Sequence, residues 1–461
     1  MKKYINILIL ISIFSLPSCT KVLEQKPQES LAAGDAFSTR TGVEAGIAGV
    51  YDGFQAGDHY GLSVWIYTDL YADNLTHTGT FPTFAQMANK QLLTDNVNIS
   101  SMWNTIYNTI NRANNIIEAA PKITDPVFNK NVALAEVRCL RAIGYFDLLR
   151  FFGGTPAGYN QAGGLGVPIF TAPTLSPADA APKPRATEAE VFTQIINDLD
   201  FAIANLPVNA ANGRVTKNAA TALKARVQLY REQWVDAEAL ATTVISQFST
   251  LPDGGLLSSA NFPNLWLVKN QKPESIWELQ YFSDDRNFGA FYYYPGSLGG
   301  RNEITSSASL NNAHEAGDLR KPINVTVAAP GIPANKTRKF LRVPGDDNII
   351  LIRLAELYLI RSEARARKPT PDITGSQSDL NVIRTRAGLP NTTAATVTDL
   401  VNAVKRERRV ELAHEGHRWF DLRRYNSIGD VGIIEPFRAL WPIPDREVKT
   451  SATVIAQNPN Y

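Results

Sequence analysis

The sequence predicts an all-α-dominated fold: a helical-repeat scaffold with long loop-rich insertions and a few short strands. Apolar residues return at three- and four-residue steps over several segments, as on one face of a helix. These segments end at Gly or Pro, which stop helices. Two of them, 216–230 and 236–248, are separated by a short bend, as in a helical hairpin.

Residues 1–18 are predicted to be a lipoprotein signal peptide. Two lysines precede an apolar run over 5–16, and this run of about 12 residues is too short to span a membrane, which takes about 20. The segment ends in Leu-Pro-Ser-Cys, which resembles a bacterial lipobox and predicts lipidation of Cys19. Residues 19–34 would then serve as lipid anchor and tether. An ordinary secretory signal with a chance cysteine is the alternative.

Residues 35–250 form the predicted N-terminal helical region. Helices are expected over 103–120, over 132–152, over 187–206 and in the hairpin 216–248. Thr187 and Glu190 have the spacing of a capping box at the start of the third helix. In the hairpin, Ala225 stands where a small residue allows close packing, and Trp234 lies at the bend. The hairpin has tetratricopeptide character, with generic helix-pair packing as the alternative.

Residues 251–461 form the predicted C-terminal region. Alternation over 275–282 indicates a short strand. Leu351, Leu354, Tyr358 and Ser362 mark one stripe of a further helix, and helices follow over 380–387 and 399–413. A loop-rich insertion at 283–347 precedes these helices, and loops of such length are usually functional.

Charge and cysteine content exclude several classes of function. Lys and Arg number 46 against 44 Asp and Glu, a net charge of +2, and removing Lys2 and Lys3 with the signal peptide leaves 2 − 2 = 0. A neutral chain lacks the positive excess of a general nucleic-acid binder. Two cysteines cannot form a disulfide framework, and Cys139 is expected to be a buried, inert thiol.

Several segments, spread in order over the chain, together resemble the SusD/RagB family of outer-membrane nutrient-binding lipoproteins. The strongest is RERRVEL at 406–412 followed by EGHRWFDLRR at 415–424. The others are 22–27, 135–156 with its FFGGTP end, 216–226, 354–364, 380–388, and 441–461 beginning WPIP. The loop-rich segments, where a ligand would be recognised, show no usable similarity.

The resemblance implies a tetratricopeptide-like scaffold, lipid-anchored to the outer membrane and facing the cell exterior. It implies a SusC-like TonB-dependent barrel as partner, a nutrient ligand that is a glycan or in some members a peptide, and no bond breakage. We therefore expect non-enzymatic binding of a glycan or oligosaccharide for delivery to the transporter. A helical-repeat scaffold for protein interaction and a peptide-binding member of the same family are the alternatives.

Three carboxylates on one predicted helix face are the strongest catalytic candidate. Glu407, Glu411 and Glu415 are four residues apart, and paired carboxylates could act on a glycosidic bond. Arginines surround them in the sequence, at 406, 408, 409, 418, 423 and 424. Arginine keeps a carboxylate ionised, whereas a glycosidase acid needs a raised pKa. We predict a structural ion-pair network and no catalytic residue.

No metal or cofactor site is predicted. His414 and His417 are three residues apart and lack the further ligand of a zinc protease site. The oxygen-rich segments 283–287 and 346–348 could each donate ligands to Ca²⁺, but neither has the spacing of a known calcium loop.

Ligand binding is the better supported chemistry. Sugars present apolar C–H faces and hydroxyl rims, which suit exposed aromatic rings and polar side chains. The candidate ligand-binding residues are Tyr60, Trp65, Tyr67, Asp73, Asn74 and Phe81 in one region, and Tyr281, Asp285, Arg286, Tyr292, Tyr293, Tyr294 and Arg301 in another.

Periodicity separates expected core positions from expected surface positions in both regions. The apolar residues at 62, 66 and 70 mark a core stripe, which would leave Tyr67 and Asn74 on another stripe. Side chains alternate along a strand, so Tyr292, Tyr293 and Tyr294 cannot all face one side. At least one of these rings is expected outside the core and against the ligand.

Overall fold

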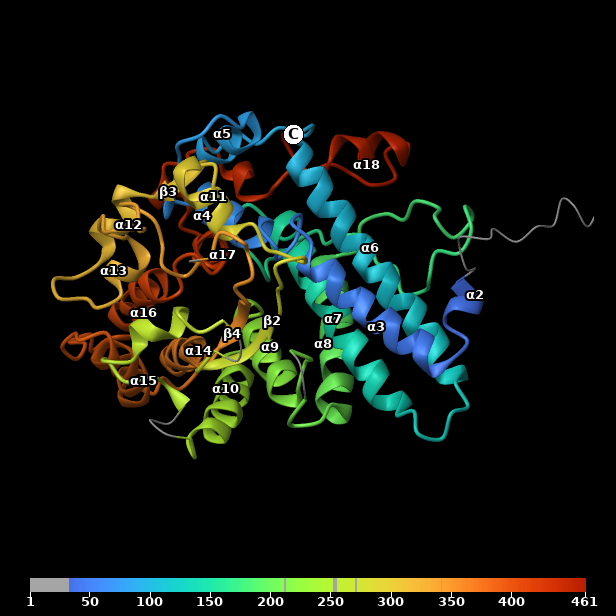
Figure 1. The fold of residues 1–461 in the computed structure, drawn as a ribbon, viewed down its shortest axis with the longest axis horizontal. Coiled ribbons are helices and arrows are strands. Elements are labelled where there is room, and N and C mark those ends of the chain that lie inside the picture. Colours follow the sequence, from blue (N-terminus) through green and yellow to red (C-terminus); the bar gives the residue numbers. More distant parts are fainter. Residues whose placement is uncertain (1–32, 211–212, 252–254, 270–271, 341) are drawn as a thin grey trace, which may run out of the picture.

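The computed structural model describes residues 33–461 except 211–212, 252–254, 270–271 and 341 (Figure 1). The predicted signal peptide, Cys19 and most of the predicted tether lie outside the described residues. Among the residues that are described, no helix combines the length and hydropathy needed to cross a bilayer.

Long helices in sequence order pack side by side through the first half of the chain. After the short α2 (Ala33–Ala36), they are α3 (Arg40–Gln55), α6 (Val97–Ala119), α7 (Lys130–Phe152), α8 (Glu188–Asn205), α9 (Lys217–Tyr230) and α10 (Trp234–Phe248). From α3 through α10, each long helix packs against the next. The predicted capping box is confirmed. The Thr187 side chain accepts a hydrogen bond from Glu190 N–H, and the Glu190 carboxylate accepts one from Thr187 N–H. The first predicted helix begins earlier than expected, because Asn96 caps α6.

The second half continues this array. Its helices are α14 (Leu354–Arg367), α15 (Ile373–Arg386), α16 (Val397–Glu411), α17 (Arg418–Arg424) and α18 (Asp445–Thr450). Helix α14 packs on α10, α15 and α16. Figure 1 shows the array running from α3 and α6 on the right, through α9 and α10, to α14 and α15 at the lower left. The prediction that Leu351 belongs to a helix is wrong, because this residue lies in a strand that ends directly before α14.

Short elements fill the loop-rich segments. The strands β1 (Leu75–His77) and β3 (Ile304–Ser306) form one antiparallel pair, and β2 (Ser275–Leu279) and β4 (Ile349–Arg353) form another. The short helices are α4 (Ser63–Tyr71), α5 (Pro82–Ala88), α11 (Gly289–Tyr293), α12 (Ala308–Ala313) and α13 (Lys321–Asn324). The 3₁₀ turns are η2 (Ala120–Lys122), η4 (Phe262–Trp266), η5 (Gly296–Leu298), η6 (Ile428–Val431) and η7 (Pro436–Ala439). The insertion at 283–347 is therefore a set of short elements and not a single loop.

Burial is more complete than the amphipathic patterns indicate. Every residue of α4 is buried, because α5, α17 and β1 surround it. Tyr67 and Asn74, which were expected to lie outside the core stripe, are also buried. Cys139 is buried in α7 as predicted, and burial raises the pKa of its thiol.

Candidate functional site

The two regions predicted to hold ligand-binding residues meet at the β1–β3 pair. Leu75 lies opposite Ser306 and His77 opposite Ile304. Figure 1 shows α4, α5, α11 and β3 grouped at the upper left, beside the helical array. Pairing between segments more than two hundred residues apart thus places the start of α5 next to α11.

Glu303 fixes the loop that leads from β1 to α5. Its backbone oxygen accepts hydrogen bonds from Thr78 N–H (2.8 Å) and Gly79 N–H (3.2 Å). Its carboxylate oxygen Oε2 accepts from Thr80 N–H (2.9 Å) and Phe81 N–H (3.3 Å). A Cβ at Gly79 would lie 1.9 Å from this oxygen, so only glycine allows the close approach. The position of Phe81 is therefore set by Glu303.

Three aromatic rings and one arginine form a partly exposed group that we call the aromatic platform: Phe81, Phe291, Tyr292 and Arg301. The Tyr292 ring centroid lies 6.1 Å from that of Phe81 and 5.4 Å from that of Phe291. The Arg301 guanidinium lies 4.4 Å from the Phe81 ring centroid, and its side chain is 44% exposed. The Phe81 and Tyr292 rings are tilted against each other (53°), and the Phe291 and Tyr292 rings meet edge to face (86°). Aromatic rings beside a cation are suited to a ligand with apolar faces and polar edges.

The three consecutive tyrosines have three different environments. They end a short helix, α11, so the argument from strand alternation used the wrong element. Tyr293 is fully buried, stacks with Trp65 and Phe340, and shares a 2.7 Å hydrogen bond between its hydroxyl and His414 Nδ1. Tyr294 is buried as well. Tyr292 alone of the three is partly exposed, and its hydroxyl has no hydrogen-bond partner among the described residues.

The pKa of Tyr292 reflects its position at the edge of the protein. Partial burial raises the pKa of its phenol, while the nearby Arg301 opposes this rise. The negative charges of Glu303 and, to a smaller degree, Asp58 raise this pKa further. Asp58 is exposed, yet the surrounding protein withdraws water from its carboxyl and raises its pKa. Glu303 and Asp58 are not among the predicted site residues, because no local sequence pattern links either of them to Tyr292.

Several predicted ligand-binding residues lie in the core instead. They are Tyr60, Trp65, Tyr67, Asn74, Tyr281, Tyr293 and Tyr294. Tyr60 donates to Asp147 (3.2 Å), and the Tyr67 ring packs edge-on against Phe84. The Tyr281 hydroxyl donates to the backbone oxygen of Gln55 (3.2 Å). These side chains face protein atoms, so the prediction that they face a ligand is corrected.

The remaining predicted residues lie at or near the surface. Asp73 accepts from Arg418 (2.8 Å) and pairs with Arg409 (2.8 Å), which gives it a structural role. Asp285 is exposed and lies 3.4 Å from the Gln55 side-chain nitrogen. Arg286 is exposed and its guanidinium lies 5.8 Å from the Phe288 ring. Of the predicted residues, the platform brings together Phe81, Tyr292 and Arg301.

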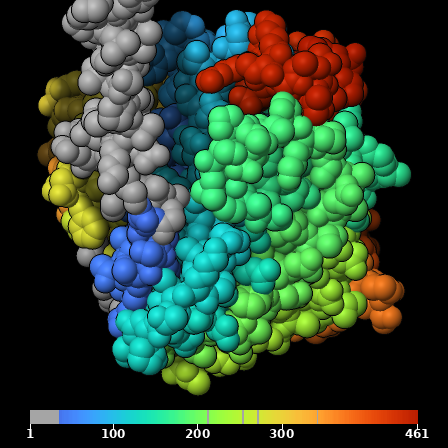
Figure 2. Space-filling view, turned by 90° about the vertical axis from the view of Figure 1, so that its right-hand side faces the viewer, coloured from blue at the N-terminus to red at the C-terminus, as the bar shows by residue number. Residues whose placement is uncertain are grey.

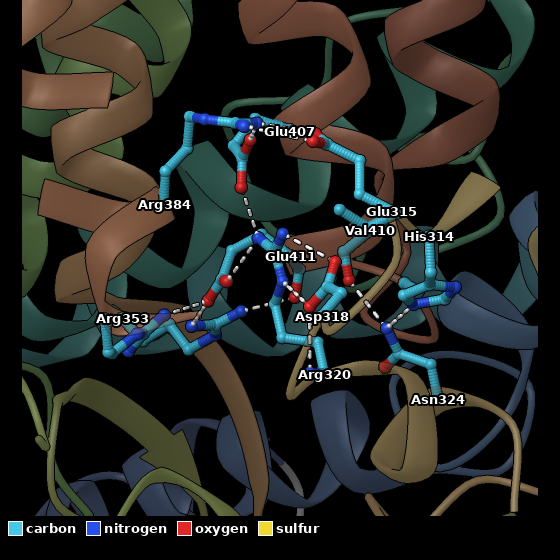
Figure 3. Close-up of polar contacts among 12 residues, drawn as sticks. His314, Glu315, Asp318, Arg320, Asn324, Arg353, Arg384, Glu407, Val410 and Glu411 are labelled. Atoms are coloured by element: carbon cyan, nitrogen blue, oxygen red, sulfur yellow. Dashed lines mark hydrogen bonds and ion pairs between the residues drawn. The ribbon is translucent and has the colours of Figure 1, made fainter. Parts of the chain in front are cut away.

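Glu407 and Glu411 of α16, together with Glu415, form a buried ion-pair network, as predicted (Figure 3). The prediction that all three share one helix face is wrong for Glu415, which lies in the turn after α16. Arg353 donates to Glu411 (2.5 Å) and to Glu415 (2.7 Å). Arg320 donates to Glu407 (2.5 Å) and lies 3.2 Å from Glu411. Arg386 pairs with Glu411 and Glu274, and Arg384 pairs with Glu407. Asp318 pairs with Arg320, and Lys339 pairs with Glu415. The cations come from distant segments and not from the arginines adjacent in sequence.

The electrostatics of this network oppose catalysis by these carboxylates. Burial alone would raise the pKa of Glu411, but Arg386, Arg353 and Arg320 outweigh burial and hold it well below its ordinary value. The pKa of Glu415 is lowered in the same way by Arg353 and Lys339 against the effect of burial. A general acid for glycoside cleavage needs the opposite shift.

The histidines and oxygen-rich segments have structural partners. Burial lowers the pKa of His414 and of His417 to about 3. Asp346 pairs with Lys269 (2.8 Å). The Asn348 side chain donates to Glu278 (2.8 Å) and accepts from Tyr281 N–H, two residues after the end of β2. Within the described ranges, no group of three His, Cys, Asp or Glu side chains is arranged to hold a metal ion.

Two family models match this chain over much of its length. The model described as "SusD family" matches residues 344–432. The model described as "Starch-binding associating with outer membrane" matches residues 21–229.

Individual relatives match along nearly the whole chain. SusD-like protein P38 of Formosa agariphila is 28% identical, over 96% of this chain and 97% of its own length. The crystal structure of a SusD superfamily protein from Bacteroides thetaiotaomicron has a TM-score of 0.78 and 27% identity, covering 92% of this chain and all of that one (100%). A laminarin-binding SusD-like protein has a TM-score of 0.74 and 24% identity, with 92% and 100% covered.

Proposed function

The chain belongs to the SusD family, and we propose that it is a non-catalytic, cell-surface protein that binds a glycan on the aromatic platform. The observation that carries the proposal is Tyr292, a partly exposed ring that packs against Phe81 and Phe291 and whose hydroxyl has no hydrogen-bond partner among the described residues. The family description of starch binding at the outer membrane supports a carbohydrate ligand.

The chemistry of the platform suits a sugar ring. Phe81 and Tyr292 offer apolar faces for C–H groups, while the Tyr292 hydroxyl and the Arg301 guanidinium offer hydrogen bonds at the edge. Because Glu303 and the β1–β3 pair fix these residues before binding, little conformational entropy is lost when a ligand arrives.

The test measures binding by Tyr292→Ala and Phe81→Ala. Mature protein without residues 1–19 is screened against neutral oligosaccharides that include laminarihexaose and maltohexaose, and the variants are titrated with those that bind. Truncation of an aromatic anchor often costs about 2 kcal/mol, so each variant should lose roughly thirtyfold in affinity. Both rings are partly exposed, so melting should change little.

Phe437→Ala is the matched control. Phe437 is also partly exposed and also lies under an arginine, with the Arg438 guanidinium 4.8 Å from its ring. This variant should bind as the wild type does. Unchanged saccharide affinity in both platform variants would show that the ligand lies elsewhere, and binding of peptides but of no saccharide would favour the peptide-binding alternative.

Anchoring and delivery complete the proposal. Lipidation at Cys19 would hold the protein on the outer membrane, with its body outside the bilayer. A SusC-like TonB-dependent barrel would receive the ligand from the platform. Co-purification of this chain with a barrel of that class from native membranes tests the partnership, and recovery of the chain without one would count against it.

A further inference from the structure

A second groove lies away from the aromatic platform, between α6, the loop before α8, and the C-terminal segment. Its volume is ≈ 480 Å³, within the range of roughly 300–1,000 Å³ typical of ligand sites. On the face shown in Figure 2, the red C-terminal segment lies against the green segment that includes this loop. Arg185 joins the two walls, donating to the Asn458 side-chain oxygen (2.8 Å).

The loop wall of the groove is fixed to α6. The Tyr107 hydroxyl donates to the Pro168 backbone oxygen (2.9 Å). Asn114 donates to the backbone oxygens of Phe170 (2.9 Å) and Ala172 (3.1 Å), and Asn111 accepts from Thr174 N–H (2.8 Å). The groove is therefore formed before any ligand enters, which reduces the entropic cost of binding.

Two amides in the groove are unused. Asn104 and Asn108 are four residues apart on α6, so they point from the same helix face. Asn104 is half-buried and Asn108 exposed, and neither makes a hydrogen bond with any other described residue. Each amide offers two N–H donors and one acceptor oxygen. Asn111 and Asn114, by contrast, are already engaged with the loop.

Aromatic rings flank these amides. Tyr107 and Phe170 line the groove with centroids 5.9 Å apart, and Trp103 lies 4.9 Å from Tyr107. Charge is nearly balanced there. Glu447 lines the groove on the α18 side, and the Lys183 ammonium lies 4.9 Å from the Phe170 ring.

We propose that this groove is a second binding site for a neutral oligosaccharide. Free amides that both donate and accept match hydroxyl groups, which also do both, and the rings match the C–H faces. Glu447 and Lys183 have opposite charges at the groove, so its electrostatics do not favour an ionic ligand over a neutral one. The proposal extends the proposed function, because the ligand class is the same while the residues are different.

The experiment crosses the two sites. Asn104→Leu with Asn108→Leu removes both free amides without breaking an intramolecular hydrogen bond. Tyr292→Ala impairs the platform. Wild type, each variant and their combination are titrated calorimetrically with laminarihexaose, maltohexaose and the other neutral oligosaccharides of the array. Asn131→Leu, on an exposed part of α7, is the control for replacing a helical Asn by Leu.

The Tyr292→Ala protein should still bind saccharide. Its remaining affinity should fall at least tenfold when the two Asn substitutions are added. Loss of all binding in Tyr292→Ala alone, or an Asn104→Leu/Asn108→Leu protein that binds with unchanged stoichiometry and affinity, would overturn the groove. Binding lost in the Asn variant and kept in Tyr292→Ala would support the groove and refute the platform. Absence of any neutral saccharide binding in wild type would refute both. If the double variant Asn104→Leu/Asn108→Leu has a lower melting temperature than wild type, the single variant Asn108→Leu, at an exposed position, is used instead.

Discussion

Replacing Glu411 by Gln tests the buried network most directly. The Glu411 side chain is fully buried at 0% exposure and contacts Arg320, Arg353 and Arg386, which are themselves 1–4% exposed. Gln keeps the size of the side chain and removes its charge. Figure 3 shows Glu411 between Arg320 and Arg353.

The expected cost follows from the remaining charges. Arg353 keeps Glu415, Arg386 keeps Glu274, and Arg320 keeps Asp318 and Glu407. Each of the three arginines therefore keeps at least one carboxylate, and the substitution weakens the network without isolating a buried charge. Isolating a buried charge costs about 3–5 kcal/mol. Losing hydrogen bonds to a charged group costs about 1.5–3 kcal/mol, and we expect the free energy of unfolding to fall by this smaller amount at pH 7.

The loss should depend on pH in a defined direction. The folded pKa of Glu411 lies well below its unfolded value of about 4.3. A lowered carboxyl pKa contributes stability that is fully present above the unfolded pKa and is lost as pH falls through the folded pKa. The difference in stability between wild type and Glu411→Gln should therefore be constant near neutral pH and shrink below about pH 4.3.

Urea unfolding followed by circular dichroism and tryptophan fluorescence measures the change. Glu118→Gln is the control, because Glu118 pairs with Lys122 on the surface, where their side chains are 58% and 68% exposed. That variant should unfold as wild type does. Folded Glu411→Gln should keep its saccharide affinity. Equal stability of Glu411→Gln and wild type would refute the network as a stabilising element, and loss of an oligosaccharide hydrolysis with unchanged stability would instead indicate catalysis.

Two further predictions concern the anchor and a buried carboxyl. Cys19→Ala should release the protein from the outer membrane in cells that lack the transporter partner, and persistent fractionation with membranes would refute lipidation at Cys19. Burial raises the pKa of Asp69 to about 7, and its carboxylate accepts from His414 N–H (2.6 Å). A raised carboxyl pKa contributes stability that is present below the unfolded value of about 3.9 and is lost as pH rises through the folded pKa. Asp69→Asn, which keeps the acceptor, should therefore be more stable relative to wild type at pH 8 than at pH 4, and parallel pH profiles of the two melting temperatures would contradict this.

Local signals predicted the elements that depend on local chemistry. The capping box at Thr187 and the strand at β2 are encoded within a few residues, and the structure has them where expected. Periodicity places Leu351 in the following helix, because a short apolar run has the same appearance in a helix and in a buried strand. Its pairing with β2, which decides between the two, is a contact over some seventy residues.

The candidate site was less predictable from the sequence than these elements, because it depends more on long-range contacts. Sequence reasoning named Phe81, Tyr292 and Arg301 from residue type alone, together with many rings that are core. Which ring faces outward is decided by the β1–β3 pair and by Glu303, whose role has no local signal. The partners of Glu411 were equally hidden, because they come from the start of α13, the end of β4 and the end of α15.

Tyr292 and Tyr293 have different roles, which explains how the backbone of the platform can be rigid while its exposed side chains can vary. Tyr293 anchors α11 through its stack with Trp65 and Phe340 and its hydrogen bond to His414, next to the buried network. Tyr292 is held by the same short helix and packs against the edge of the core, with its ring centroid 5.6 Å from that of Phe84, but it remains partly exposed. Substitution of Tyr293 should therefore cost stability, whereas substitution of Tyr292 should change the surface offered to ligand. A scaffold built in this way can alter its ligand through exposed rings while the packing that positions them remains intact.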